Sequence, residues 1–140
     1  FEIMTRISYW ATILLGVAVW LIMALLFHLT ALLFNGQASF GHIARATSYP
    51  FIIPAVVILV GIFLLDGLDL PQTEEITTML PNHPRFKLAM GLINYSFVPY
   101  YLIVAVFIRH IYQIRYVYAI LSVAIPVVSI WAITELFKLM

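Results

Sequence analysis

The sequence predicts an all-α protein, a polytopic transmembrane helical bundle with four spans. Charged residues make up only 9% of the chain and hydrophobic residues 64%, with a mean hydropathy of +1.08. Soluble domains carry about 25% charged residues, so lipid must be part of the solvent around this chain. A helix needs about 20 apolar residues to cross a hydrocarbon core roughly 30 Å thick. Four uncharged stretches match or exceed roughly that length, at residues 7–44, 46–65, 88–108 and 116–134.

The first span is predicted at residues 9–34, which is long enough to cross the membrane with some tilt. Aromatic residues near its start suit the belt at a membrane surface. The Asn35-Gly36 pair is expected to end the helix, because both residues tolerate the left-handed conformation of a helix C-cap.

The second span is predicted at residues 49–65. Residues 40–48 precede it as a short amphipathic or extended lead, which Ser39 can cap. Pro50 falls near the first turn, where its missing N–H costs little, whereas Pro54 lies deeper and is expected to kink the helix.

The longest polar segment, residues 66–87, follows the second span. A short helix lying on the membrane surface is predicted near residues 71–80, where apolar residues recur at helical spacing. The last two spans are predicted at residues 88–108 and 116–134, joined by a tight basic turn at residues 109–115. Beyond them, Glu135 and Lys138 are expected to form an interfacial i,i+3 ion pair.

The arginines suggest an orientation. The short loops at residues 35–48 and 109–115 contain three arginines and no acidic residue. The positive-inside rule then places both loops in the cytoplasm and the loop at residues 66–87 on the opposite side, although that side carries four basic residues. Phe1 would lie outside, which predicts a further span or segment before it. We treat residues 1–140 as a single integral membrane domain.

The same three arginines, Arg45, Arg109 and Arg115, are candidate contacts for lipid head groups. Each basic residue near an anionic membrane surface contributes about 1 kcal/mol of attraction. They also fit the simpler interpretation that they are ordinary topology signals.

Two tyrosines are candidate contacts with a partner subunit. Tyr100 and Tyr101 lie deep in the third predicted span, where their hydroxyls need hydrogen-bond partners. Those partners belong either to another subunit or to the same chain, at Asn94 and Ser96. Helix packing is the favoured role of Asn94 and Ser96.

His28 and His110 are candidate cofactor ligands. His28 lies within the first predicted span, and ionisable groups there often mark function. The predicted topology brings His110 toward the same membrane face, and neutral imidazole is a common ligand of haem and metals. The favoured interpretation is structural, a histidine hydrogen-bonded to a neighbouring helix. No cofactor is expected, although haem or a chlorophyll-type pigment stays open at these residues.

The sequence offers no motif for catalysis or for metal binding. Cysteine is absent, which removes disulfides and thiolate metal sites. The acidic residues of the segment 66–87 match no calcium-binding loop, and no serine lies in a nucleophile elbow. A net charge of +1 gives no electrostatic case for nucleic acid. We therefore predict that the protein is not an enzyme.

Three short motifs surround the end of the first predicted span: Phe27-His28-Leu29, Leu33-Phe34-Asn35-Gly36-Gln37-Ala38-Ser39-Phe40 and Ser48-Tyr49-Pro50. They resemble the Yip domain family, the Rab/Ypt-interacting membrane proteins and their prokaryotic relatives. The basic turn at residues 109–115, followed by an apolar closing helix, is also similar. The family usually has five spans and a cytoplasmic N-terminus, so the resemblance implies a span missing before Phe1. It also implies a binding or scaffold role without catalytic residues. Asn35 stands where a second glycine is more usual.

Three functions follow as hypotheses. The first is a non-catalytic integral membrane protein, a Yip-like scaffold or an accessory subunit of a larger complex, with membrane lipids and other integral subunits as partners. The second is a subunit that binds haem or pigment in an electron-transfer or photosynthetic complex. The third is a small transporter or channel, suggested by prolines within spans.

Overall fold

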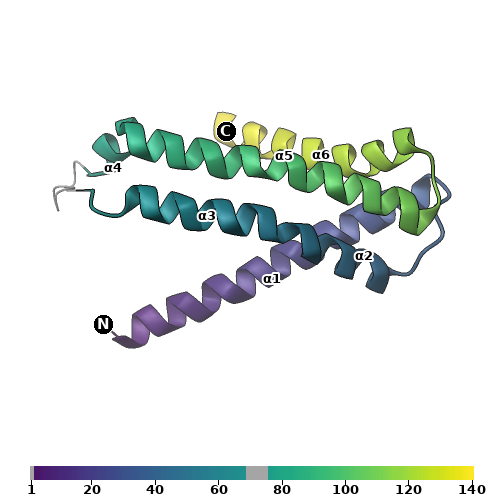
Figure 1. Ribbon diagram of the computed structural model, residues 1–140, viewed down its shortest axis with the longest axis horizontal. Helices are drawn as coiled ribbons and strands as arrows, with labels where there is room; N and C mark the ends of the chain where they lie inside the picture. The colour runs from purple at the N-terminus through teal and green to yellow at the C-terminus, as the bar shows by residue number, and fades with distance from the viewer. Residues whose placement is uncertain (1, 69–75) are drawn as a thin grey trace. The chain divides into compact units, whose positions relative to one another are not determined.

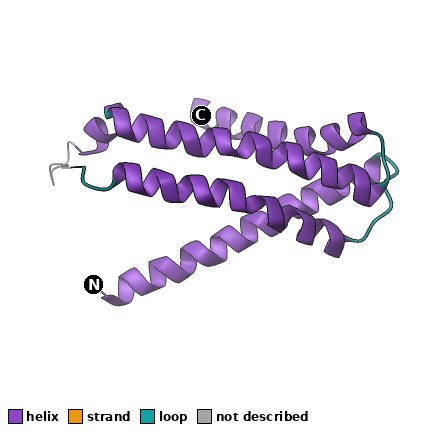
Figure 2. Ribbon diagram, viewed as in Figure 1, coloured by secondary structure: helices purple, strands orange, loops and turns teal. Residues whose placement is uncertain are grey.

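The computed structural model describes residues 2–68 and 76–140, and in these ranges it contains helices and short connections without any strand (Figure 2). Within them, the helices long and apolar enough to cross a membrane are Glu2–Leu33, Phe40–Leu65, Pro84–Tyr112 and Tyr116–Leu139. The predicted all-α class and its four spans are confirmed.

The elements along the chain are α1 (Glu2–Leu33), α2 (Phe40–Ser48), the 3₁₀ turn η1 (Tyr49–Phe51), α3 (Ile52–Leu65), α4 (Ile76–Met79), the 3₁₀ turn η2 (Leu80–Asn82), α5 (Pro84–Tyr112) and α6 (Tyr116–Leu139) (Figure 1). Each of the four helices runs beyond the predicted bounds at one end or both, because charged residues end the hydrocarbon crossing without ending the helix. The predicted surface helix near 71–80 falls partly outside the described residues, and α4 with η2 forms its last part.

The second span begins as α2 and is briefly interrupted before α3. At the η1 turn the N–H of Ile52 donates to the carbonyl of Tyr49, three residues back. Pro54 has no N–H to offer the carbonyl of Pro50, so the regular i to i−4 ladder cannot form there. The departure from α-helix therefore precedes Pro54, which lies buried in the first turn of α3.

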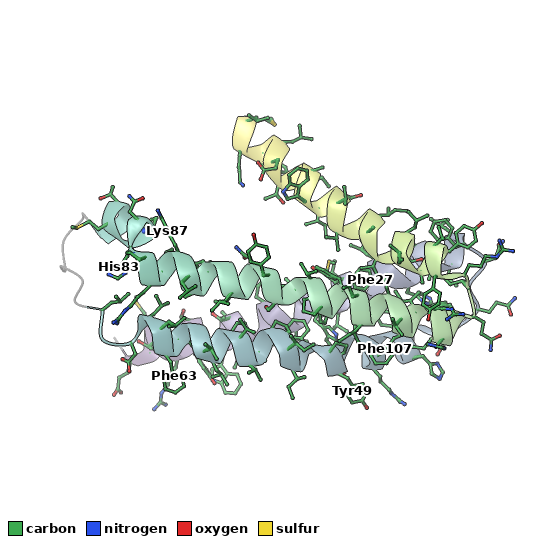
Figure 3. The ribbon with its side chains drawn as sticks, turned by 45° about the horizontal axis from the view of Figure 1, so that its top comes forward. Phe27, Tyr49, Phe63, His83, Lys87 and Phe107 are labelled. Carbon is green, nitrogen blue, oxygen red and sulfur yellow. The ribbon has the colours of Figure 1, made fainter. Side chains whose placement is uncertain are left out.

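The chain forms two compact units. Unit 1 comprises Phe1–Thr47 and Val104–Met140, and unit 2 comprises Ser48–Ile103. In unit 1, the second half of α1 packs against α6. Its core combines small, aliphatic and aromatic side chains, such as Ile43 and Ile108, with Phe27 (labelled in Figure 3) fully buried between alanines at Ala24 and Ala31.

In unit 2, α3 lies beside the first part of α5 (Figure 1). A Cβ added to Gly61 would lie 3.2 Å from the Cδ1 of Ile93 and 3.8 Å from the Cβ of Ala89, so the glycine allows this close approach. Tyr49 of η1 and Phe63 of α3 project away from α5 (Figure 3) and are 72% and 77% exposed. Large apolar side chains on the outside are expected where lipid replaces water.

The two halves of α1 differ in their surroundings. Every residue from 2 to 19 is exposed, whereas Ala24, Phe27 and Ala31 in the second half are completely buried. Exposed side chains of the first half include Trp10 and Leu14, at 62% and 68%. This half is exposed on all sides, and most of its side chains are apolar.

Candidate functional site: the His28 centre of unit 1

His28 forms a hydrogen bond that joins two spans. Its Nδ1 lies 2.5 Å from the hydroxyl oxygen of Tyr112 at the end of α5, and Tyr112 is only 1% exposed. The Phe40 ring of α2 packs against the imidazole in a T-shaped contact, with the ring centroids 5.9 Å apart. The predicted structural role, a histidine bonded to a neighbouring helix, matches this geometry. A polar group in a span is expected to find such a partner.

The end of α1 brings its connection to α2 against Tyr112. Asn35 adopts a left-handed φ of 61°, and its N–H donates to the carbonyl of Leu32 while the N–H of Gly36 donates to that of Ala31. These two bonds make a Schellman motif, which satisfies carbonyls left open at the helix end. A Cβ on Gly36 would lie 2.8 Å from the Cδ1 of Tyr112, so only glycine fits there.

The two connections of unit 1 therefore meet at one end. The Phe34 ring beside Asn35 stacks on Tyr118 of α6, with ring centroids 5.1 Å apart. Gln113, just after α5, adopts a left-handed φ of 55° and turns the chain toward α6. The loops 35–48 and 109–115 thus lie on the same side of unit 1, as the four-span topology requires. Which side of a membrane they face stays a prediction.

Two more hydrogen bonds hold α1 to its neighbours in unit 1. The indole N–H of Trp20 donates to the hydroxyl of Thr47 on α2, with 3.1 Å between Nε1 and Oγ1. The hydroxyl of Thr30 lies 2.8 Å from the carbonyl of Ser122 on α6 and also within bonding distance of carbonyls in its own helix. Together with His28 and Tyr112, these pairs join four helices by polar contacts.

His110 is exposed and does not share the position of Tyr112 on α5. Residues two apart on a helix point in nearly opposite directions. Since Tyr112 faces His28, His110 projects away from that contact. Among the residues that the structure describes, no three His, Cys, Asp or Glu side chains come together as a group able to hold a metal ion.

The three predicted lipid-facing arginines belong to this end of unit 1. Arg109 lies over the ring of Tyr116, with its guanidinium carbon 3.6 Å from the ring centroid. Arg45 and Arg115 are exposed on α2 and just before α6. An arginine stacked on an aromatic ring keeps its charge near the surface while covering apolar area. Their contact with lipid stays a prediction.

The two predicted partner-facing tyrosines lie in unit 2. Tyr100 is 4% exposed and forms edge contacts with Phe51 and Phe97, whereas Tyr101 is half-buried beside it. Tyr100 therefore takes part in an internal aromatic cluster of unit 2. Ser96 donates to the carbonyl of Ile93 in its own helix, 2.6 Å away.

Asn94, the other proposed partner of these tyrosines, is exposed on α5. The predicted ion pair near the end of α6 is confirmed, with 2.7 Å between Lys138 Nζ and Glu135 Oε1.

The partner of His28 was not predicted. The sequence predicts Tyr112 to belong to the aromatic belt at the membrane surface, because it lies beside a basic turn. A usable signal was nonetheless present: an imidazole within a span requires a polar partner. Tyr112 ends a neighbouring span, and both residues precede connections that the topology places together.

Comparisons of the chain with family models, with curated proteins and with solved structures give no match. The resemblance to the Yip domain family therefore stays a prediction.

Proposed function

We propose that the protein is a non-catalytic integral membrane protein that acts as a Yip-like scaffold or as an accessory subunit of a larger membrane complex. One contrast supports this proposal most directly. The polar side chains that join the helices of unit 1 bond to one another or to a backbone carbonyl, while half of α1 carries nothing but exposed surface.

The polar groups within unit 1 are used for packing. His28 bonds to Tyr112, Trp20 to Thr47, and Thr30 reaches the carbonyl of Ser122. Such bonds between spans contribute about 0.6 kcal/mol each on average. Groups committed to each other in this way hold helices in register, which favours a role in assembly over a role in chemistry.

The exposed half of α1 supplies the surface that such a role needs. Residues 2–19 form about five turns of helix in which every residue is exposed, and Trp10 and Leu14 are more than half exposed. Other integral membrane subunits can cover such a surface, because association within lipid depends on close packing rather than on water exclusion.

Site-specific photo-cross-linking tests this proposal. A photo-reactive residue at Leu14, 68% exposed on α1, should give a discrete heavier product in native membranes. The same residue at Phe63, 77% exposed on α3, is a matched control for non-specific collision. The full-length chain, isolated in mild detergent, should also co-purify with stoichiometric partners. A lone monomer with an intrinsic catalytic activity and only lipid adducts at Leu14 would contradict the proposal.

A cofactor-binding subunit is the second candidate, and one observation favours it. The Nδ1 of His28 is held by Tyr112, which fixes the ring and leaves Nε2 for another ligand. Ligating histidines in proteins are commonly oriented through their second nitrogen in this way. A visible absorbance spectrum of the purified protein decides between the candidates. Haem or pigment bands that disappear in His28→Ala would support the second one, and a spectrum without such bands removes it.

A further inference from the structure

The face of α5 that points away from α3 in unit 2 has unusual chemistry for a lipid-exposed surface. Ala89, Ile93 and Tyr100 lie on the side that contacts α3 and η1. At about 100° per residue, the opposite side of α5 carries a stripe with spacings of four, three and four residues. Its members are Lys87, Gly91, Asn94 and Val98, and all four line one surface hollow.

Asn94 lies within the hydrocarbon region when α5 spans a membrane. It is seven residues beyond Lys87, the last charge before the uncharged stretch, and therefore about 10 Å deeper along the helix. Its side chain is exposed, and its amide makes no hydrogen bond to another described residue. An amide without a partner is costly in lipid, so this face requires a partner with polar capacity at the same depth.

A second copy of the chain supplies such a partner. A carboxamide donates and accepts hydrogen bonds, so two Asn94 side chains satisfy each other across a two-fold axis. Gly91, one turn away, leaves open space, since nothing lies within 4 Å of a Cβ added there. Small residues at this position let two helix backbones approach closely. In such a dimer Lys87 would lie at the aqueous edge, where salt screens the repulsion between the two ammonium groups.

We propose that the Gly91–Asn94–Val98 face of α5 packs against the same face of a second copy, with the two Asn94 amides hydrogen-bonded across the axis. The inference requires only that α5 spans a membrane, and it holds whether or not the protein acts as a scaffold.

The absence of cysteine makes the test direct. Val98→Cys places one thiol on the proposed interface, and Leu92→Cys places one about 120° around the helix and about 9 Å away along its axis. Both positions are exposed, at 55% and 40%. In the full-length protein reconstituted in lipid bilayers, oxidation should give a disulfide-linked dimer for Val98→Cys and little for Leu92→Cys.

A second substitution tests the hydrogen bond itself. Asn94→Leu added to Val98→Cys should lower the cross-linked fraction about three- to tenfold, as the loss of an interhelical hydrogen bond implies. Asn94→Gln keeps a carboxamide and should retain more of the dimer. A Val98→Cys protein that stays monomeric, or that cross-links no more than Leu92→Cys at the same protein density, overturns the proposal. A heavier product found only in native membranes also overturns it, because it assigns this face to an unlike subunit.

Discussion

His28 in unit 1 and Asn94 in unit 2 are both polar residues within spans, and their surroundings differ. The imidazole of His28 is bonded to a buried tyrosine and lies against an aromatic ring. The amide of Asn94 faces outward without a bond to the described residues. Both groups are costly in a membrane when they lack partners. The bond of His28 therefore holds the chain together, and the exposed amide of Asn94 indicates a contact outside the chain.

The largest effect is expected at the glycine beside Tyr112. Gly36→Ala would place a Cβ 2.8 Å from both the Ala31 carbonyl oxygen and the Tyr112 ring. Overpacking of this kind should lower the free energy of unfolding by about 1–3 kcal/mol. Gly41→Ala is the matched control, because nothing lies within 4 Å of its added Cβ. That change should be neutral or stabilising by about 0.5–1 kcal/mol, since alanine favours a helix. Equal losses for both variants, measured by reversible unfolding in mixed micelles, would contradict the close contact.

The next effect concerns the hydroxyl that partners His28. Tyr112→Phe removes this oxygen and keeps the ring, so the imidazole loses its hydrogen bond while the packing is preserved. The free energy of unfolding should fall by about 0.6–1.7 kcal/mol, the range for polar bonds between spans. Tyr95→Phe, at a 77% exposed position on α5, provides the control and should change little. Equal unfolding free energies for Tyr112→Phe and Tyr95→Phe would contradict a stabilising bond between His28 and Tyr112.

A smaller effect is expected where α1 meets α2. Trp20→Phe removes the indole N–H that donates to Thr47 and keeps an aromatic ring. A loss of about 0.6 kcal/mol is expected. The same substitution at Trp131, 64% exposed on α6, should cost less and serves as the reference. A larger loss at Trp131 would show that ring size, rather than the hydrogen bond, decides the result.

The smallest effect on the free energy of unfolding is expected at Asn94. Asn94→Leu should leave the unfolding free energy of the monomer within about 0.5 kcal/mol, as is usual for exposed sites. His28→Leu should destabilise the monomer, because it strands the Tyr112 hydroxyl in a buried position. Unfolding of both variants is measured at a protein concentration too low for self-association. A substantial loss for Asn94→Leu would mean that its amide is bonded within the chain.

The sequence alone was sufficient for the four spans, because the spacing of charges and the length needed to cross lipid are both read along the chain. The same holds for Asn35 at the end of α1 and for the pair of Glu135 and Lys138, which depend on near neighbours. Tyr112 could not be assigned to His28 in this way. The two residues are 84 positions apart, and their pairing depends on how α1 and α5 meet.

The helix bounds show the same limit. Charges at Arg6 and Lys87 mark where a span is expected to enter water, and the helices continue past them because the backbone bonds of a helix are internal. The sequence predicts a kink of the second span at Pro54, whereas the irregular turn η1 lies at Tyr49–Phe51. The carbonyl deprived of a donor belongs to the residue four positions earlier, so the irregular turn precedes the proline.

A double-mutant cycle between His28→Leu and Tyr112→Phe tests the central claim most directly. The unfolding free energy of the wild type, the two single variants and the double variant would be measured in one lipid environment. A direct bond predicts a coupling energy of about 0.6–1.7 kcal/mol, with the double variant little worse than either single one. Additive losses with no coupling would contradict the account, because His28 would then have some role other than holding α1 to α5.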